Sequence, residues 1–336
     1  MQVKKLGKQT WEIANSVKII GCGSIAGTLE GRGPLNHGFD KILEDDFNGE
    51  STWEKAESKL QSDAINAALI NADVKISEID MMLAGDLLNQ CMGSTFAVRD
   101  IDIPYLGLYG ACSTFAEALL IGTMAIDGGF ATNVICGTSS HFGASERQFR
   151  FPMEYGGKRP PTAQWTVTGA GMAVLSSGGS GPSITHITPG KAIDPKIVDA
   201  NNMGAAMAPA FVDTLKAHFN DTGFEPGSYD MILSGDLGLL GREIACDLAN
   251  DEGICLNKNY QDCGMMVFDL DRQDVGCGGS GCGCSAIVFS GYIMNELKKK
   301  NIKNLLLVGT GALLSPTSVQ QGESIPSVAH AVAISG

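Results

Sequence analysis

The sequence has no long hydrophobic run and few basic residues, and both features exclude some classes of function. No apolar stretch approaches the roughly 20 residues that a membrane-spanning helix requires. Lysine and arginine number 24 against 37 aspartates and glutamates, which gives a net charge of -13. A chain this acidic is a poor partner for nucleic acid or for a bare anionic membrane surface. Residues 1–13 include lysines but no apolar core, so we predict no signal peptide.

The sequence also lacks the paired C-x2-C spacing of structural zinc sites, although it contains ten cysteines. Glycines separate most of the cysteines between residues 263 and 284. We therefore predict no metal site and interpret most of the cysteines as reduced, small core residues. A hydrophobic fraction of 44% in 336 residues is enough for a large core without disulfides or metals.

The order of motifs in the first half of the chain returns in the second half. The stretch IDMMLAGDLL at 79–88 recurs as YDMILSGDLG at 229–238. Further on, Cys112-Ser113 matches Cys284-Ser285, and 25 residues separate the cysteine from the next Gly-Thr in both halves. An ordered series of matches indicates two copies of one unit.

Each copy is predicted to contain a helix, a strand, a second helix and a second strand. In the first copy, Ser51 and Glu54 match a capping box at the start of the first helix. The strands are continuously apolar, which is typical of sheets covered on both faces. The helix from 112 to about 126 is apolar on all sides, so we place it between two layers.

These patterns predict an α/β fold, a five-layer α/β/α/β/α sandwich whose two halves are related by a pseudo-twofold axis. The first half is predicted to span residues 1–188 and the second half 189–336. The first half contains a loop insertion at 141–168, polar and rich in glycine and proline, that has no counterpart in the second half. A long loop inside a compact fold is usually functional.

Cys112 stands at the start of the buried helix of the first half. The dipole of that helix favours a thiolate there, and the backbone N–H groups of the first turn favour a bound anion. The residues leave two interpretations open, a working nucleophile and the floor of an anion pocket.

The repeat with Cys112 on its central helix resembles the thiolase superfamily, which includes thiolases and ketoacyl synthases. Longer motifs, among them GACST, TVTG, MGAAMAPA, GGSGCGCSA and GTGALLSPT, resemble the stage V sporulation protein AD family of spore-forming Firmicutes. That resemblance implies a thiolase-like, non-enzymatic protein that binds dipicolinic acid. It further implies a part in moving calcium dipicolinate into the developing spore, and it leaves a part in germination open.

The resemblance also implies partners and a location. The expected partners are dipicolinic acid, the SpoVA membrane proteins and a second copy of the chain in a homodimer. The protein is expected to be made in the cytosol and to lie peripherally at the inner spore membrane. No cofactor is expected, and whether calcium enters with the ligand stays open.

The comparison with catalytic members of the superfamily predicts that this chain is not an enzyme. Thiolase-type chemistry needs a base for the cysteine and donors for the developing oxyanion. At the two loops where such enzymes carry histidines, this sequence has Gly235-Asp236 and Ser280. Two alternatives stay in view: an active acyl transferase that uses Cys112, and a scaffold subunit with a vestigial pocket.

The predicted ligand pocket draws residues from both halves of the chain. Cys112 and Ser280 lie at its centre, and the resemblance implies that Gly309 and Gly311 bring a second stretch of backbone close to the ligand. His141 ends an apolar strand, on the side where α/β sheets gather their ligands, and Thr168 of the TVTG motif is a further candidate.

The remaining candidates would supply charge and stacking. Arg147 and Arg150 are spaced to share one helical face and to bind a carboxylate, or else to form surface ion pairs. Tyr155 or Trp165 would stack on the ligand ring or pack in the core. Asp236 would accept from the ligand, hold calcium or bond to a loop. The other four histidines are interpreted as scaffold.

Overall fold

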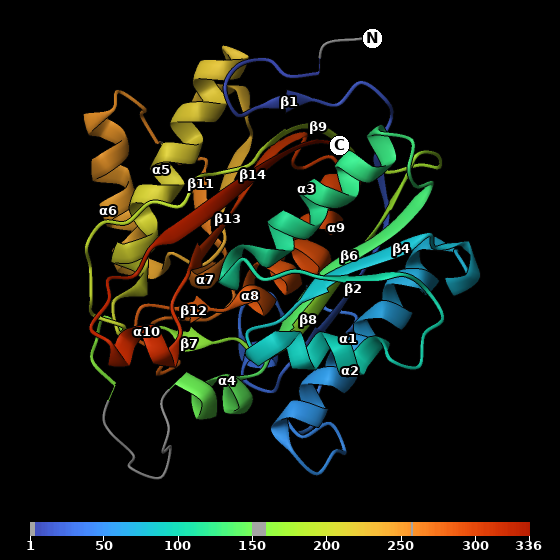
Figure 1. The fold of residues 1–336 in the computed structure, drawn as a ribbon, viewed down its shortest axis with the longest axis horizontal. Helices are drawn as coiled ribbons and strands as arrows, with labels where there is room; N and C mark the ends of the chain where they lie inside the picture. Colours follow the sequence, from blue (N-terminus) through green and yellow to red (C-terminus); the bar gives the residue numbers. More distant parts are fainter. Residues whose placement is uncertain (1–3, 150–158, 257) are drawn as a thin grey trace.

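The protein is described by a computed structural model that covers residues 4–149, 159–256 and 258–336 (Figure 1). The strands are β1 (Trp11–Glu12), β2 (Lys18–Ala26), β3 (Lys41–Ile42), β4 (Met81–Gly85), β5 (Tyr105–Gly107), β6 (Asn133–Ser140), β7 (Trp165–Thr166), β8 (Gly169–Ser176), β9 (Ser183–Thr188), β10 (Met231–Ser234), β11 (Tyr260–Asp262), β12 (Gly279–Ser280), β13 (Asn304–Ala312) and β14 (Ser327–Ser335). The helices are α1 (Trp53–Ala72), α2 (Met92–Val98), α3 (Thr114–Asp127), α4 (Phe142–Phe149), α5 (Met203–Thr222), α6 (Gly238–Asp251), α7 (Cys263–Met266), α8 (Cys282–Ile287), α9 (Met294–Lys298) and α10 (Pro316–Gln320).

Two groups of five strands repeat one arrangement. The first group has the order β5-β4-β6-β8-β2 and the second the order β11-β10-β13-β14-β9. In each group the strand of the repeated sequence motif, β4 or β10, pairs in parallel with both of its neighbours. The two groups join through a single register pair between β2 and β9, Lys18 with Ser183. The repeat inferred from the sequence is thus present in the strand order.

The join between the two groups lies just before β9. This strand pairs with β14 along its length, so it is part of the second group. The boundary predicted after residue 188 falls at the far end of β9, whereas the pairing puts the change of sheet between β8 and β9. Because β9 contributes its residues to the second sheet, the turn at 177–182 connects the two halves.

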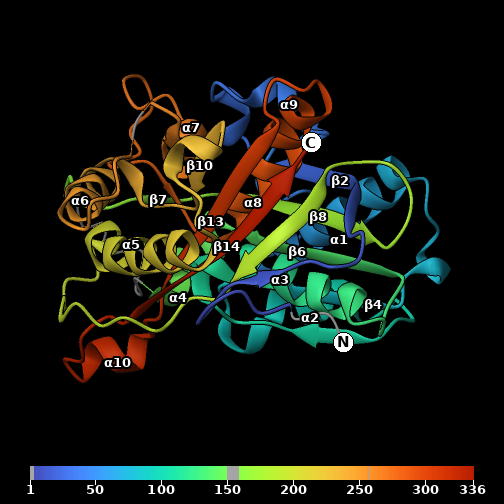
Figure 2. The same cartoon turned by 90° about the horizontal axis from the view of Figure 1, so that it is seen from above.

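The layers follow from which faces the helices cover. Helix α1 packs against β2 and β8, and α5 packs against β13 and β14 with α6 beside it. Helix α3 contacts β4, β6 and β8 of the first group and β13 and β14 of the second. Figures 1 and 2 show α3 lying between the two groups of strands. The predicted five-layer α/β/α/β/α sandwich is confirmed.

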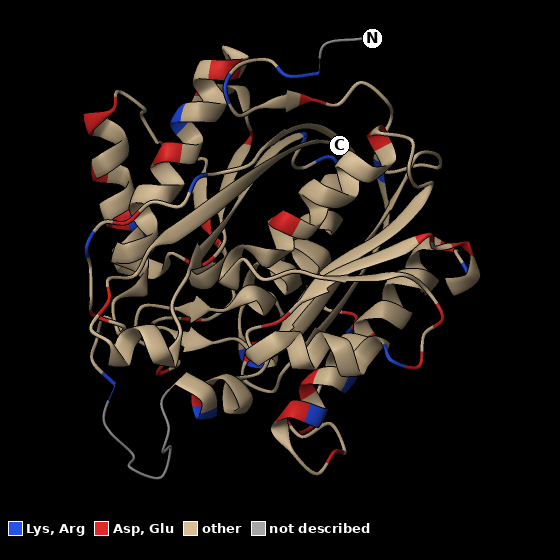
Figure 3. Cartoon of the chain, viewed as in Figure 1, with Lys and Arg blue, Asp and Glu red and all other residues tan. Residues whose placement is uncertain are grey.

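The sequence explains why α1 lies outside and α3 inside. Helix α1 buries one side, including Leu60, Ala64 and Ala68, and leaves the other in solvent. Helix α3 is apolar nearly all round, and its Phe115 packs against Phe289 with ring centroids 5.4 Å apart. Figure 3 shows that the charged residues lie mostly on the outer helices and loops. Among the described residues, no helix has the length and apolar character to cross a membrane.

Two local predictions differ from the structure. Helix α1 is capped by Thr52, whose side chain accepts from the Lys55 backbone N–H at 3.3 Å, rather than by Ser51. Thr52 has the extended backbone of an N-cap residue, so the helix begins one residue later than the capping box requires. Residues 142–149, predicted as part of a loop, form α4 because the His141 ring accepts from the Gly143 and Ala144 N–H groups.

Candidate functional site

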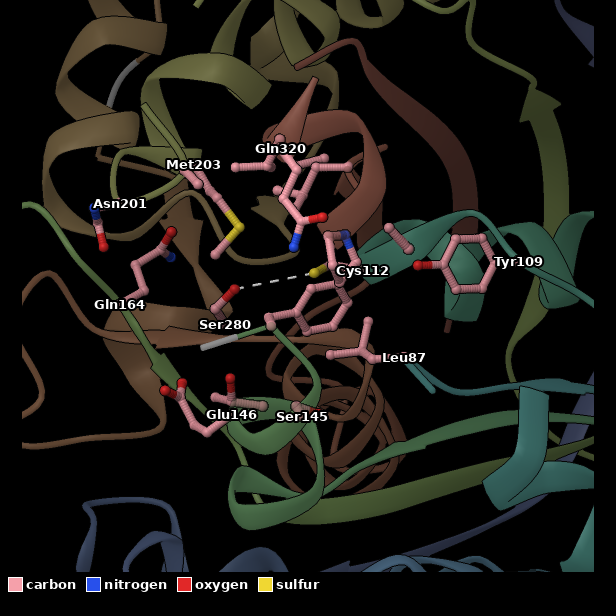
Figure 4. Close-up of a pocket in the computed structure, with 18 residues that line it drawn as sticks. Leu87, Tyr109, Cys112, Ser145, Glu146, Gln164, Asn201, Met203, Ser280 and Gln320 are labelled. Atoms are coloured by element: carbon pink, nitrogen blue, oxygen red, sulfur yellow. Dashed lines mark hydrogen bonds between the residues drawn. The ribbon is translucent and has the colours of Figure 1, made fainter. Parts of the chain in front are cut away.

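A cavity of about 320 Å³ lies beside the turn that leads into α3. Its described walls come from both halves: Ser145, Glu146 and Phe149 of α4, the segment 200–203 before and at the start of α5, and the segment 312–320 that includes α10. Figure 4 shows these side chains around Cys112, with Gln320 and Met203 pointing towards the thiol. The cavity therefore lies where the two copies of the repeat meet.

Cys112 lies in the 3-10 turn Ala111–Ser113 and is 6% exposed. Ala111 has a φ of 50°, a left-handed conformation that a non-glycine residue rarely adopts. The turn packs closely on β13, because a Cβ on Gly311 would stand 2.2 Å from the Gly110 carbonyl oxygen. The Sγ atom of Cys112 lies 4.0 Å from the Ser280 Oγ, across the boundary between the halves.

Asp236 lies next to Ser280, and three groups donate hydrogen bonds to its carboxylate. Its carboxylate accepts from the Ser280 hydroxyl at 3.0 Å, from the Gly281 N–H at 3.0 Å and from the Thr310 hydroxyl at 2.8 Å. Burial raises its pKa from 3.8 to about 6, although hydrogen bonds from Cys112, Thr310 and Gly281 pull the pKa down. Asp236 therefore ties the loop after β10 to β13 and to the start of α8.

The thiol of Cys112 is held in its neutral form. Burial raises its pKa well above the usual value, and the negative charge of Asp236 raises it further. The helix start was expected to favour a thiolate, but desolvation and the nearby carboxylate outweigh the helix dipole. A thiol at neutral pH is a weak nucleophile.

A second wall of the cavity is built around Arg159. Its guanidinium pairs with Glu146 at 2.8 Å and donates to the Gln164 carbonyl oxygen at 3.1 Å. It also lies 4.6 Å from the ring centroid of Trp165, which stacks on Phe142 with centroids 4.0 Å apart. These contacts fix the positions of Glu146 and Gln164, which both line the cavity.

The structure brings together only part of the predicted site. Cys112 and Ser280 line the cavity, and Asp236 is bonded directly behind Ser280. Gly309 and Gly311 are not among the lining residues, because they lie against Ala116 and Gly110 and allow β13 to approach the Cys112 turn. Their role here is close packing.

The other predicted residues lie elsewhere. Arg147 is on the opposite side of α4, where it pairs with Glu54 and lies 5.5 Å from the ring centroid of Trp53. His141 caps α4 and bonds to the Asp46 carbonyl oxygen at 2.7 Å, and Thr168 accepts from the Phe142 N–H at 3.0 Å. A helix turns by about 100° per residue, so Ser145, Glu146 and Phe149 face the cavity while Arg147 faces away. Arg150 and Tyr155 lie outside the described residues.

No histidine lies among the described residues of the cavity wall. His218 is buried between Thr188 and Tyr229, and His330 accepts from the Gly190 N–H at 3.1 Å. His186 lies beside His218, and His37 packs edge-on against Tyr292. Within the described ranges, no group of three or more His, Cys, Asp or Glu side chains is placed to hold a metal ion.

Sequence reasoning missed Gln164, Ser145, Met203 and Gln320 as cavity residues. Gln164 reaches the cavity because β7 pairs with β12, which brings residues 165–166 beside 279–280. No motif in the sequence predicts that β7 pairs with β12. The hydrophobic start of α5 and the segment around α10 carry no residue pattern that distinguishes a cavity wall from a core.

Comparison with solved structures defines the class of the fold. A variant of OleA from Xanthomonas campestris aligns with a TM-score of 0.62 at 13% identity, covering 97% of this chain and 99% of that chain. The 3-oxoacyl-[acyl-carrier-protein] synthase III of Aquifex aeolicus aligns with a TM-score of 0.58 at 12% identity, covering 95% and 100%. The fold is therefore the thiolase-like α/β sandwich.

Sequence comparison then defines the family. The family model for stage V sporulation protein AD (SpoVAD) matches residues 7–335. Stage V sporulation protein AD of Bacillus subtilis is 43% identical over 330 residues, which cover 98% of this chain and 97% of that protein. The chain belongs to the SpoVAD family, and its role is in sporulation.

Proposed function

We propose that this protein is a non-enzymatic binding protein that takes dipicolinate into the Cys112 cavity during sporulation. In this role it takes part in the uptake of calcium dipicolinate into the developing spore, together with SpoVA membrane proteins. It acts as a peripheral protein at the inner spore membrane. Family membership supports the sporulation role, and the cavity supports the binding role.

The arrangement of Cys112, Ser280 and Asp236 carries the proposal. A condensing enzyme needs a base beside its cysteine. Here the neighbour of the thiol is a hydroxyl that donates to Asp236, and that carboxylate accepts two further hydrogen bonds. The thiol thus lies beside an anchored hydroxyl and the Asp236 carboxylate, and the charge and the hydrogen bond of that carboxylate both oppose ionisation of the thiol.

The walls of the cavity suit a small aromatic ligand with polar edges. Its volume of about 320 Å³ falls in the range of about 300–1,000 Å³ that is typical of small-molecule sites. Leu87, Phe149 and Met203 offer apolar contacts for a ring, while Ser145 and Gln164 offer polar atoms at its edge. A pyridine dicarboxylate has this combination of a flat ring and polar edge.

We further propose a homodimer formed through the first sheet. Strand β5 is the last strand of the order, so one of its edges is unpaired in the described sheet. Leu106 on this strand is 51% exposed, and Tyr109, which follows it, also lines the cavity. An exposed edge strand is a template for pairing with a second chain.

Calorimetry with dipicolinate tests the proposed function. The wild type should bind dipicolinate and not isophthalate, which has the same carboxylates but no ring nitrogen. Leu87→Trp should fill the cavity and abolish binding, while Leu239→Trp, at an exposed position on α6, should leave it unchanged. No heat and no thermal shift between pH 6 and 8 would favour the scaffold alternative.

Acyl trapping tests the enzymatic alternative. The wild type is incubated with acyl-CoA, and its intact mass is compared with that of Cys112→Ala. We expect no adduct on either protein, because the thiol is neutral and buried. A stable acyl adduct on the wild type that is absent from Cys112→Ala would show that the protein is an acyl transferase.

A further inference from the structure

Two helices that line the cavity occupy equivalent places in the two copies of the repeat. In the first copy, residues 141–168 connect β6 to β8, and this connection contains α4. In the second copy, residues 313–326 connect β13 to β14, and this connection contains α10. The residues that these helices place in the cavity wall are Ser145, Glu146 and Phe149 of α4 and Pro316, Val319 and Gln320 of α10.

Helix α4 is fastened to the body of the protein by side chains. Arg147 on this helix pairs with Glu54 of α1. The His141 ring accepts from the first N–H groups of the helix and bonds on its other side to the Asp46 carbonyl oxygen at 2.7 Å. The α4 side of the cavity is therefore a fixed wall.

Helix α10 has no such fastening among the described residues. Every hydrogen bond that the described structure contains for residues 315–323 joins two members of that segment. No residue of the segment is buried, and Val319 is 37% exposed although it lines the cavity. A segment with internal hydrogen bonds and few buried contacts separates from the rest of a protein at low free-energy cost.

The two ends of this connection, by contrast, are held in place. The Leu313 N–H donates to the Pro326 carbonyl oxygen at 2.7 Å, which continues the pairing of β13 with β14. The Ile325 N–H donates to the Ile197 carbonyl oxygen at 2.8 Å. Because both ends are anchored and lie close together, residues 315–323 can swing away from the cavity as one unit without disturbing the sheet.

We propose that residues 315–323 form a lid that opens to admit a ligand to the Cys112 cavity and closes behind it. Cys112 is 6% exposed with the lid as described, and Figure 4 shows Gln320 of the lid pointing towards the thiol. A ligand that contacts Gln320 favours the closed position, because it interacts with the closed lid and not with the open one. The inference rests on the proposed function in taking dipicolinate as the ligand, and it adds how dipicolinate enters and leaves.

Access to the Cys112 thiol tests the lid without any ligand. In the shortened variant, a Gly-Ser-Gly linker replaces residues 315–323, since Leu313 and Pro326 are already joined by a hydrogen bond. The reagent is N-(1-pyrenyl)maleimide, whose large fused ring system needs a wide opening. Mass spectrometry gives the labelling rate of Cys112 relative to that of the exposed Cys255. We expect this ratio to rise by about tenfold or more, because labelling follows the population of the open state.

A point variant tests the same lid in a chain of full length, including the case in which the shortened chain does not fold. Val319→Ala removes apolar contact between the lid and the cavity, so the labelling ratio should rise by about fivefold. Thr317→Ala is the matched control, because Thr317 is exposed on the same helix and is not among the described lining residues. The control should label like the wild type.

The rates of dipicolinate binding test the lid with its ligand. Stopped-flow mixing measures association and dissociation for the wild type and for the shortened variant. We expect both rate constants to rise by about tenfold or more in the variant, because the lid must open for entry and for release.

Unchanged labelling of Cys112 in the shortened variant and in Val319→Ala would overturn the inference. Unchanged rate constants for dipicolinate in the shortened variant would overturn it as well. Both results leave the proposed function in place. A wild type that binds no dipicolinate would instead refute the proposed function, and the labelling comparison, which uses no ligand, would still decide whether the lid opens.

Discussion

Asp236 controls the chemistry of the cavity at the scale of single residues. It is buried, it accepts three side-chain and backbone donors, and its charge opposes the ionisation of Cys112. A change at this one carboxylate should therefore alter both the reactivity of the thiol and the pH dependence of stability.

We expect Asp236→Asn to make Cys112 more reactive. Removing the negative charge lowers the pKa of the thiol, and the thiolate fraction at pH 8 rises by roughly tenfold for each unit by which that pKa falls. The measurement is the rate of iodoacetamide labelling of the Cys112 peptide, followed by mass spectrometry. The exposed Cys255 serves as an internal reference, and an unchanged ratio between the two rates would contradict the electrostatic coupling.

The same variant should change how stability depends on pH. The pKa of Asp236 is raised from 3.8 to about 6, so the folded protein holds this proton more tightly than the unfolded chain does. The contribution to stability is present below pH 4 and is lost as the pH rises through 6, which corresponds to about 3 kcal/mol. Urea unfolding should show that the free energy of unfolding of Asp236→Asn, relative to that of the wild type, increases by about that amount between pH 4 and pH 8.

Asp230→Asn is the control with the opposite sign. The Asp230 carboxylate accepts from the Lys303 and Asn304 N–H groups, and these hydrogen bonds lower its pKa. This carboxylate stabilises the folded protein at pH values above the pKa that Asp230 has in the unfolded chain, and the stabilisation is lost as the pH falls. The free energy of unfolding of Asp230→Asn, taken relative to that of the wild type, should therefore fall as the pH rises. Parallel behaviour of the two variants would show that the pH effect does not come from these carboxylates.

At the scale of elements, β13 and the turn before α3 hold the cavity in shape. A Cβ on Gly311 would stand 2.2 Å from a backbone oxygen, so any larger residue must move the Cys112 turn or the strand. Neither can move freely, because β13 is paired on both sides and α3 is packed between two sheets.

Gly311→Ala should therefore destabilise the protein by about 1–3 kcal/mol, the usual cost of overpacking. Gly227→Ala is the matched control, since a Cβ there meets no atom within 4 Å and its backbone is outside the left-handed region. Urea unfolding of both variants measures the effect. If the two variants were equally stable, β13 and the Cys112 turn would be able to move apart without lowering the free energy of unfolding.

The elements that could be predicted from the sequence are those with a repeated or continuous pattern. The motif at 79–88 and 229–238 gave the two matching strands, and the apolar run after Cys112 gave the buried helix. Helix α4 could not be predicted, because its cap is a histidine ring held by a carbonyl oxygen from residue 46. Gln164 was missed for a similar reason, since its place depends on the pairing of β7 with β12.

At the scale of the whole molecule, the proposed dimer depends on the exposed edge of the first sheet. We expect Leu106→Lys to weaken dimerisation, because a lysine on an edge strand opposes pairing with a second chain. Sedimentation equilibrium measures the effect, with Ile70→Lys on an exposed position of α1 as the control. A wild type that is monomeric at all concentrations would refute the homodimer.

The single register pair between β2 and β9 has a consequence for how the chain acquires its structure. The two sheets share little strand pairing, so they are held together mainly by helices, with α3 packed against both sheets and α8 packed against β6 and β8 of the first. During synthesis the first half emerges with an apolar helix that has no second layer to cover it until residues 304–335 exist. We expect the nascent first half to be a client of chaperones, and the halves to melt together in one transition.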